Sequence, residues 1–284
     1  MLSELLPFVM QTHAFHQHSV KQSKGSVNPY INFSDLTWFE FPLPPLDVQQ
    51  RLANALSLAD LATRSLASCA LRATQLQQSL IAASVVPPGD SSVTLADVAT
   101  LDVDHVRVQA SDTLRLAGVY SFGRGLLDRG YVQASETKYP MLQRLKAGQV
   151  VVSKLKAWEG ATAVVPNAFH GAYVSPEFPT FTLNTQRLTS SFMDLVCRSP
   201  WFWSAVTAKC KGTAERRARI HPREFLELKI NVPSLSYQTH VCRQVDAVQS
   251  LIDAFSRRVS AAREVFRTVL APLDTATSTG THDR

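Results

Sequence analysis

The chain has 284 residues, of which 45% are hydrophobic, 8% aromatic and 18% charged. This composition supports buried cores and excludes a disordered or collagen-like protein. At about 150 residues per domain, the length predicts two domains. A net charge of +6 favours a polyanionic partner. Because the sequence has neither a membrane-length apolar run nor a basic N-terminal signal segment, we expect a cytoplasmic protein with no membrane partner.

The first 43 residues predict a short helical segment followed by a strand. The pattern indicates a helix around Ser3–Val20, a turn at Lys24-Gly25-Ser26 and a strand around Thr37–Phe41. A long helix is then predicted from Asp47 to Ser84. Prolines on both sides of this helix set its limits, because proline is tolerated at a helix start and ends a helix further on.

Residues 91–235 follow a different pattern, typical of an α+β domain. Short runs of β-forming residues between Gly, Pro, Asn and Asp predict strands. These runs are Leu116–Tyr120, Gly148–Ser153, Thr162–Val165 and Phe178–Leu183. Helices are expected at Ser190–Cys197 and Pro200–Lys209, and a second long helix at Ser236–Ala271. We expect residues 275–284 to form a disordered tail.

The sequence repeats itself. An offset of 189 residues aligns Leu43-Pro44-Pro45-Leu46 with Val232-Pro233-Ser234-Leu235, and Gln49 with Gln238. Upstream, an offset of 187 aligns Lys24-Gly25-Ser26 with Lys211-Gly212-Thr213. The repeat begins near residue 2, so residues 1–43 correspond only to the last third of the α+β domain.

Apolar residues follow each Pro-x-Leu junction at alternating spacings of four and three residues. Such a stripe packs on another helix, so we expect the two long helices to pair as an antiparallel coiled coil. The alternative is that each helix covers its own neighbouring domain. The predicted helix–helix interface consists of Leu52, Leu56, Leu66, Leu80, Val241, Val245, Val248, Ile252, Phe255, Val259 and Phe266.

No motif predicts an active site or a metal site. Asn28-Pro29-Tyr30 lacks the second proline of an amino-methyltransferase motif, and Gly123-Arg-Gly125 lacks a third glycine at dinucleotide-binding spacing. Three histidines lie close together but lack an acidic or cysteine partner, namely His13, His16 and His18. The four cysteines have no zinc-ligand spacing, so we expect buried free thiols at Cys69, Cys197, Cys210 and Cys242.

Basic residues indicate a nucleic-acid site. Between Lys209 and Arg223, six basic residues and one acidic residue give a local charge of +5, next to Gly212-Thr213. A second basic cluster follows a strand at residues 153–158, and an earlier Gly-rich loop carries two arginines. The predicted DNA-binding residues are Arg124, Arg129, Lys154, Lys156, Trp158, Lys211, Thr213, Arg216, Arg217 and Arg219. The alternative is scattered surface charge, with Trp158 in the core.

These features together resemble the specificity (S) subunit of type I restriction-modification systems. The duplicated junction of proline, leucine and long helix carries the resemblance. Further motifs similar to that family are Trp158-Glu-Gly160, Tyr173-Val-Ser-Pro-Glu-Phe178 and Gly212-Thr213 followed by Arg217 and Ile220. The resemblance covers nearly the whole chain.

The resemblance implies a non-catalytic subunit that reads a bipartite site in double-stranded DNA. Its two helices form a spacer and bind methyltransferase (M) subunits, and restriction (R) subunits join the complex to cleave DNA. S-adenosylmethionine and ATP belong to those partners, so no cofactor is expected here. The alternative is an assembly module without DNA binding, or an inactive remnant of a disrupted specificity gene.

The resemblance also implies an unequal division of the chain. Residues 1–43 would be the C-terminal remnant of a first target recognition domain, 44–86 the first spacer helix, 91–235 a second and whole recognition domain, and 236–274 the second spacer helix. Three origins stay open, namely a gene fragment, an internal start or rearranged locus, and a subunit completed by a second specificity chain. We expect exposed apolar side chains at Leu5, Leu6, Phe8 and Phe15.

Overall fold

The computed structural model describes residues 1–86, 92–211 and 218–274. Contacts divide the chain into two units, each containing part of both long helices. The first unit comprises Met1–Ala73 and the described residues from Ser250 onward, and the second comprises Thr74–Gln249.

The first unit is helical. Two short elements precede its first longer helix, because Thr12 caps a new helix by accepting a hydrogen bond from the Phe15 amide. The single helix predicted at Ser3–Val20 is therefore wrong. Besides its parts of the long helices, this unit contains η1 (Ser3–Leu5), α1 (Leu6–Val9), α2 (His13–Gln22), α3 (Phe33–Leu36) and η7 (Ala271–Leu273).

A compact apolar cluster holds the first unit together. Leu5 is fully buried and Phe8 is 8% exposed, against Leu56 of α4 and Leu270 of α8. The expectation that Leu5 and Phe8 are exposed is wrong, because the ends of the two long helices cover them. Leu6, on the other side of α1, is 44% exposed as expected.

The second unit contains two main sheets. The four-stranded sheet has the order β2-β10-β7-β8, and the five-stranded sheet has the order β3-β6-β9-β4-β5. All neighbouring strands are antiparallel except β4 and β9. The first sheet comprises β2 (Ala99–Leu101), β7 (Val150–Val152), β8 (Thr162–Val164) and β10 (Thr180–Leu183). The second comprises β3 (His105–Arg107), β4 (Thr113–Val119), β5 (Leu126–Gln133), β6 (Met141–Arg144) and β9 (Tyr173–Val174).

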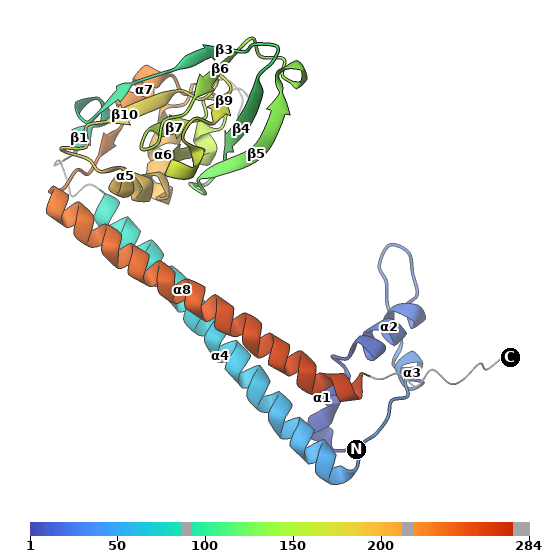
Figure 1. The fold of residues 1–284 in the computed structure, drawn as a ribbon. Helices are drawn as coiled ribbons and strands as arrows, with labels where there is room; N and C mark the ends of the chain where they lie inside the picture. Colours follow the sequence, from blue (N-terminus) through green and yellow to red (C-terminus); the bar gives the residue numbers. More distant parts are fainter. Residues whose placement is uncertain (87–91, 212–217, 275–284) are drawn as a thin grey trace. The chain divides into compact units, whose positions relative to one another are not determined.

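Helices cover the four-stranded sheet (Figure 1). The helices predicted at Ser190–Cys197 and Pro200–Lys209 are confirmed as α5 and α6 with the same limits. A short helix α7 (Pro222–Leu226) leads into β11 (Lys229–Ile230), which pairs with β1 (Val93–Thr94). Short 3-10 turns complete the unit: η2 (Leu95–Asp97), η3 (Ala134–Glu136), η4 (Ala157–Glu159) and η5 (Asn167–Phe169).

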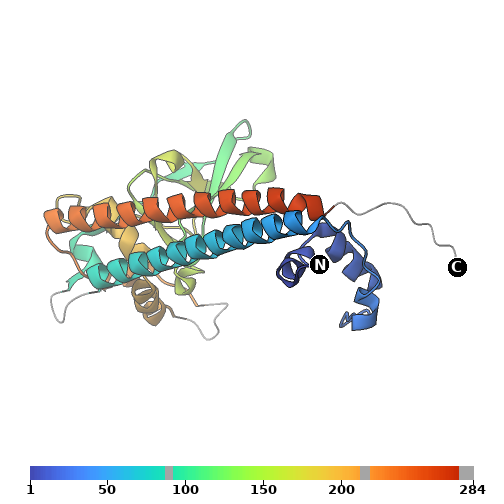
Figure 2. The ribbon, with the colours of Figure 1, turned by 90° about the horizontal axis from the view of Figure 1, so that it is seen from below.

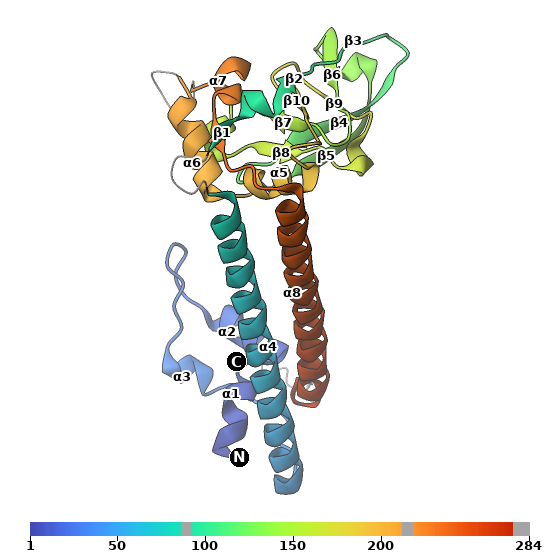
Figure 3. The ribbon, with the colours of Figure 1, turned by 90° about the vertical axis from the view of Figure 1, so that its left-hand side faces the viewer.

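The two long helices, α4 (Leu46–Val85) and α8 (Leu235–Leu270), pack side by side (Figures 1, 2 and 3). Both predicted helices are confirmed to within one residue at each end. In the second unit, the Gln77 side chain of α4 donates to Gln249 of α8 at 2.9 Å. In the first unit, Leu56 lies in one cluster with Leu270. Residue numbers therefore fall along one helix as they rise along the other, which makes the pair antiparallel and confirms the predicted fold class.

The same contacts occur in both sequence repeats. In the first unit, Gln49 accepts a hydrogen bond from the Leu2 amide at 2.8 Å and donates to the Pro44 carbonyl at 2.7 Å. In the second unit, Gln238 accepts from the Thr189 amide at 2.9 Å and donates to the Pro233 carbonyl at 2.8 Å. Leu2 and Thr189 are 187 residues apart, whereas the glutamines and the prolines are 189 apart. The structure thus reproduces both offsets of the sequence repeat.

A second set of repeated contacts surrounds the Lys-Gly turn. Lys24 bridges Tyr30 through the backbone, and its ammonium group pairs with Asp35 at 2.9 Å. In the second unit, Lys211 bridges Arg219 and pairs with Glu224. The acid in each copy also closes a capping box, on α3 and α7 respectively.

The strand predicted at Thr37–Phe41 is absent. Its repeat equivalent in the second unit, β11, is a strand because β1 pairs with it. No segment of the described chain pairs with Glu40 and Phe41 in this way. A strand requires a partner, so the same sequence pattern gives different secondary structure in the two units.

The cysteines differ in exposure. Cys197 is buried, Cys210 and Cys242 are half-buried, and Cys69 on α4 is exposed. The expectation of four buried thiols is wrong for Cys69, because that helix position faces solvent. None of the described helices is long and apolar enough to cross a lipid bilayer.

Candidate nucleic-acid interface

The loop that follows β7, residues 153–160, lies at the centre of the candidate interface. It contains η4 and ends at Gly160, whose φ is +68°. A Cβ atom at Gly160 would lie 2.5 Å from the Trp203 ring of α6, so only glycine fits at this approach. The Thr207 hydroxyl of α6 donates to the Trp158 carbonyl at 2.9 Å. Helix α6 therefore fixes the backbone of this basic loop.

The loop that contains Arg124 packs against the η4 loop. The Ser121 hydroxyl donates to the Glu159 carboxylate at 2.5 Å, and the Phe122 amide donates to the Glu159 carbonyl at 2.8 Å. The exposed Arg124 side chain lies over the Tyr120 ring and donates to the Ser121 carbonyl. The structure thus brings Arg124 and Lys156 together on two connected loops.

On its other side, the η4 loop joins the segment after α6. The Lys154 ammonium donates to the Pro176 carbonyl at 3.0 Å, and its own carbonyl accepts from the Ile220 amide at 3.2 Å. Arg219 pairs with Glu177 at 3.1 Å. Lys211 joins the same group because its backbone bridges that of Arg219.

We expected Arg129 to lie in a loop, but it lies in strand β5. It is exposed, and the face of β4 at Gly118 lies against its guanidinium group. Arg129 also lines a cavity of about 550 Å³ together with Ser153, Leu155 and Glu177. The arginine therefore borders the same loop as the other cations.

Three carboxylates partly neutralise this surface. Lys156 pairs with Glu159 at 2.7 Å, Lys211 with Glu224, and Arg219 with Glu177. The hydrogen bond from Lys156, followed by that from Ser121, lowers the pKa of Glu159. Glu224 raises the pKa of Lys211 and has its own pKa lowered by that lysine. Of the six predicted cations that the structure describes, three are paired with these carboxylates. The surface therefore keeps a moderate positive charge.

Sequence reasoning missed these carboxylates for two reasons. Glu224 lies immediately beyond the segment over which the local charge was counted. Glu177 lies 42 residues from Arg219 and reaches it only through the fold. Lys209 is also paired, with Glu227 at 3.1 Å. The acids that follow the basic segment in the sequence would have been the detectable signal.

The remaining predicted contacts vary in placement. Trp158 is half-buried, and the Lys156 ammonium lies 5.4 Å from its ring centre, so the indole supports this lysine. Thr213, Arg216 and Arg217 lie outside the described residues.

The three N-terminal histidines do not form a site. His13 and His16 are exposed, and His18 contacts the Asp35 carbonyl at 2.8 Å. Within the described ranges, no three His, Cys, Asp or Glu side chains are arranged to hold a metal ion.

The structure places the predicted helix–helix residues at covered positions of α4 and α8. None of them is exposed. Five are buried, namely Leu56, Val241, Val245, Val248 and Val259. Six are half-buried, namely Leu52, Leu66, Leu80, Ile252, Phe255 and Phe266.

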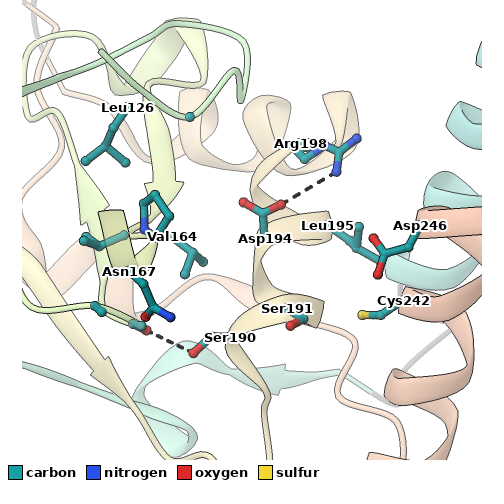
Figure 4. Close-up of a pocket in the computed structure, with 15 residues that line it drawn as sticks. Leu126, Val164, Asn167, Ser190, Ser191, Asp194, Leu195, Arg198, Cys242 and Asp246 are labelled. Atoms are coloured by element: carbon teal, nitrogen blue, oxygen red, sulfur yellow. Dashed lines mark hydrogen bonds and ion pairs between the residues drawn. The ribbon is translucent and has the colours of Figure 1, made fainter. Parts of the chain in front are cut away.

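A separate cleft of about 600 Å³ lies between β8, α5 and α8 in the second unit (Figure 4). Asp194 pairs with Arg198 at 3.7 Å, and Asp246 and Cys242 lie on the neighbouring helix. Burial raises the pKa of Asp194, against the lowering effect of Arg198. Two carboxylates and one guanidinium do not suit a polyanion, so we do not include this cleft in the candidate interface.

Comparison with known structures identifies the fold. No protein-family model matches this sequence, and a search of curated proteins finds no match. The chain is similar to the HsdS subunit from Thermoanaerobacter tengcongensis, with 15% identity and a TM-score of 0.55 over 96% of this chain and 70% of that one. It is similar to the type I restriction-modification S subunit from M. genitalium, with 13% identity and a TM-score of 0.56 over 98% and 74% of the two chains.

A third similar chain comes from a structure described as showing complex assembly and conformational transition of the type I R-M system. Its identity is 18% and its TM-score 0.56, over 95% of this chain and 70% of that one. The β-rich unit and the paired long helices thus have the fold of these specificity subunits. The chain has the fold of the type I restriction-modification HsdS subunit, as its sequence resemblance predicted.

Proposed function

We propose that this chain is the DNA-recognition subunit of a type I restriction-modification complex. Residues 91–235 would act as its recognition domain, and α4 and α8 as the spacer to which methyltransferase subunits bind. Restriction subunits would join that complex. One observation carries the proposal: cations separated by up to 95 residues meet around the η4 loop of an HsdS-like fold.

The described cations suit contact with a DNA backbone. Arg124 and Lys156 are exposed on loops whose backbone is fixed by hydrogen bonds, so they need little ordering on binding. The ion pairs of Lys156, Lys211 and Arg219 would be exchanged for phosphate contacts, which makes affinity sensitive to salt. No catalytic role is proposed, because methylation and cleavage would belong to the partner subunits.

Binding to a randomised duplex library tests sequence recognition. Selection with the full chain, alone and with its methyltransferase subunit, should enrich one sequence over the random background. Equal binding of enriched and random duplexes, with the same salt dependence, would overturn the proposal. That result, together with intact methyltransferase binding, would favour the assembly module instead.

The charge-reversal pair Arg124→Glu and Lys156→Glu tests the surface. We expect the double variant to lose about tenfold or more in affinity and to show a salt slope smaller by about one to two. Binding to the methyltransferase subunit should be unchanged. Arg187→Glu is the matched control, since Arg187 is an exposed arginine of the second unit outside this surface. A loss as large in the control would contradict the assignment.

Charge reversal at Arg216, Arg217 and Arg219 extends the test to the segment after α6. These changes should weaken DNA binding and leave methyltransferase binding intact. Simultaneous loss of both activities would indicate misfolding of the second unit.

A further inference from the structure

The tip of the β4–β5 hairpin holds one aromatic residue in a strained conformation. The hairpin loop is closed by a hydrogen bond from the Tyr120 amide to the Gly125 carbonyl at 2.9 Å. Within this loop, Phe122 has a φ of +62°, and no other non-glycine residue of the described ranges has a positive φ. A bulky side chain is strained in this left-handed region, because its Cβ atom lies too close to the following carbonyl oxygen.

Neighbouring segments hold Phe122 in this conformation. Its amide donates to the Glu159 carbonyl at 2.8 Å, and the Gly123 amide donates to the Gly160 carbonyl at 3.0 Å. Gly123 also lies so close to the end of α5 that a Cβ atom there would be 2.5 Å from the Cys197 carbonyl oxygen. The loop therefore cannot relax without losing its contacts with the η4 loop and with α5. Strain that is held in place by its surroundings is typical of functional sites.

The strain does not serve to bury the ring. The Phe122 ring contacts the Trp203 ring in a T-shaped arrangement, with the centroids 5.8 Å apart, but Phe122 remains 55% exposed. Full burial of an aromatic side chain would offset the strain, whereas partial cover offsets less of it. The ring is therefore presented to solvent on a fixed loop, as a side chain that contacts a ligand would be.

Exposed cations lie on the same loops as this ring. Arg124, two residues further along the hairpin loop, is exposed and lies over the Tyr120 ring at 5.0 Å from its centre. Lys156 is exposed on the η4 loop, to which the Phe122 amide is bonded through Glu159. An aromatic ring beside exposed cations suits a nucleotide, because a base presents an apolar face and its phosphates carry negative charge.

We propose that Phe122 is a base-stacking residue, whose ring inserts beside a base of bound DNA and partly unstacks one base step. Arg124 and Lys156 would contact the flanking phosphates. The inference rests on the proposed function. Because base steps differ in how easily they unstack, with pyrimidine–purine steps the most deformable, Phe122 would contribute sequence preference without a hydrogen bond to a base edge. The fixed loop favours insertion, since little order is gained on binding.

Removal of the ring from the full chain tests this role. Phe122→Asn deletes the ring, and asparagine tolerates the left-handed conformation. We expect this variant to bind the enriched duplex at least about fivefold more weakly. Its salt slope should be unchanged, because stacking releases no counterions, whereas the Arg124→Glu and Lys156→Glu pair lowers that slope. Its thermal unfolding midpoint should equal or exceed that of the wild type, because the strain is relieved.

Two further variants serve as controls. Phe122→Trp keeps an aromatic ring at the hairpin tip and should bind the enriched duplex about as tightly as the wild type. Tyr237→Asn removes an exposed aromatic ring of α8, outside the candidate interface, and should not change DNA affinity. Equal losses for Tyr237→Asn and Phe122→Asn would overturn the assignment.

The fluorescence of 2-aminopurine reports unstacking directly, because it rises when neighbouring bases separate. This base analogue is placed in turn at each adenine of the enriched duplex. The wild-type chain should raise the fluorescence at one step, and Phe122→Asn should abolish that rise. Weaker binding of Phe122→Asn without a fluorescence change at any position in the wild-type complex would overturn unstacking.

The remaining outcomes separate this inference from the proposed function. If the wild-type chain binds random and enriched duplexes equally, both are overturned. If it prefers the enriched duplex and Phe122→Asn keeps the same affinity and fluorescence, only the role of Phe122 is overturned. A lower unfolding midpoint together with weaker binding would assign the ring to packing on Trp203 instead. Loss of methyltransferase binding with full DNA affinity would make Phe122 a protein contact, which also contradicts the inference.

Discussion

At the scale of single residues, Gln49 and Gln238 join each long helix to the segment packed on it. Both are buried, at 4% and 0% exposure. Gln238 makes the larger set of bonds, since it also donates to the Arg187 carbonyl at 2.7 Å and accepts from the Thr189 hydroxyl at 3.1 Å. A side chain with one acceptor and one donor group is needed at this site, because it faces both amides and carbonyls.

Gln238→Leu should therefore destabilise the second unit by about 2–3 kcal/mol, because it leaves the Thr189 amide and two carbonyls without a partner. Urea denaturation of the full chain, monitored with a spectroscopic probe in the second unit, measures the change in the free energy of unfolding. Gln50→Leu is the control, since Gln50 is exposed and bonds only Asn54. A loss below about 0.5 kcal/mol for Gln238→Leu would show that water replaces these bonds.

At the scale of elements, the two long helices and α5 and α6 could be predicted from the sequence, whereas the N-terminal helices and the strands could be predicted only in part. Alternating spacings of four and three residues indicated α4 and α8, and prolines set their limits to within one residue, because both signals are local in the sequence. Strands such as β2 and the short β9 depend on distant partners. The segment at Thr37–Phe41 shows the same dependence, since it has the strand pattern without the partner.

The helix pair should depend on its inner face alone. Leu56 is fully buried and Leu58, two residues further along α4, is 67% exposed. Leu56→Ala should lower the free energy of unfolding of the first unit by about 2–4 kcal/mol, through lost burial and a cavity.

Leu58→Ala is the matched control, for which we expect a change within about 0.5 kcal/mol. Thermal unfolding of both variants by circular dichroism provides the measurement. Equal losses in the two variants would mean that Leu58 is covered in solution, by another chain or by self-association.

At the scale of the whole molecule, the candidate site shows what one sequence does not contain. The positions of the basic residues were visible, but Glu177 joins Arg219, and Ser121 joins Glu159, only through the fold. Arg129 was expected in a loop and lies in a strand, because its glycine neighbours serve a bulged hairpin. The repeat, in contrast, could be predicted from the sequence alone, because finding it requires only a comparison of the chain with itself.

The repeat also defines a pair of matched substitutions for testing whether the two units unfold independently. Leu5 in the first unit is equivalent to Phe192 in the second, and both are fully buried. Leu5→Ala should cost about 2–4 kcal/mol and Phe192→Ala about 3–5 kcal/mol, each in its own unit. Each unit has its own apolar core, so local opening should stop where that core ends.

Hydrogen exchange of the full chain distinguishes independent unfolding of the two units from joint unfolding. Leu5→Ala should speed exchange within residues 1–43 and leave residues 92–211 and the affinity for DNA unchanged. Phe192→Ala should do the reverse and abolish DNA binding. If Leu5→Ala speeds exchange equally in both units, then α4 and α8 transmit the destabilisation along their length, because each helix contributes residues to both cores. The chain would then unfold as one cooperative unit, and the first unit would contribute to the stability of the candidate interface.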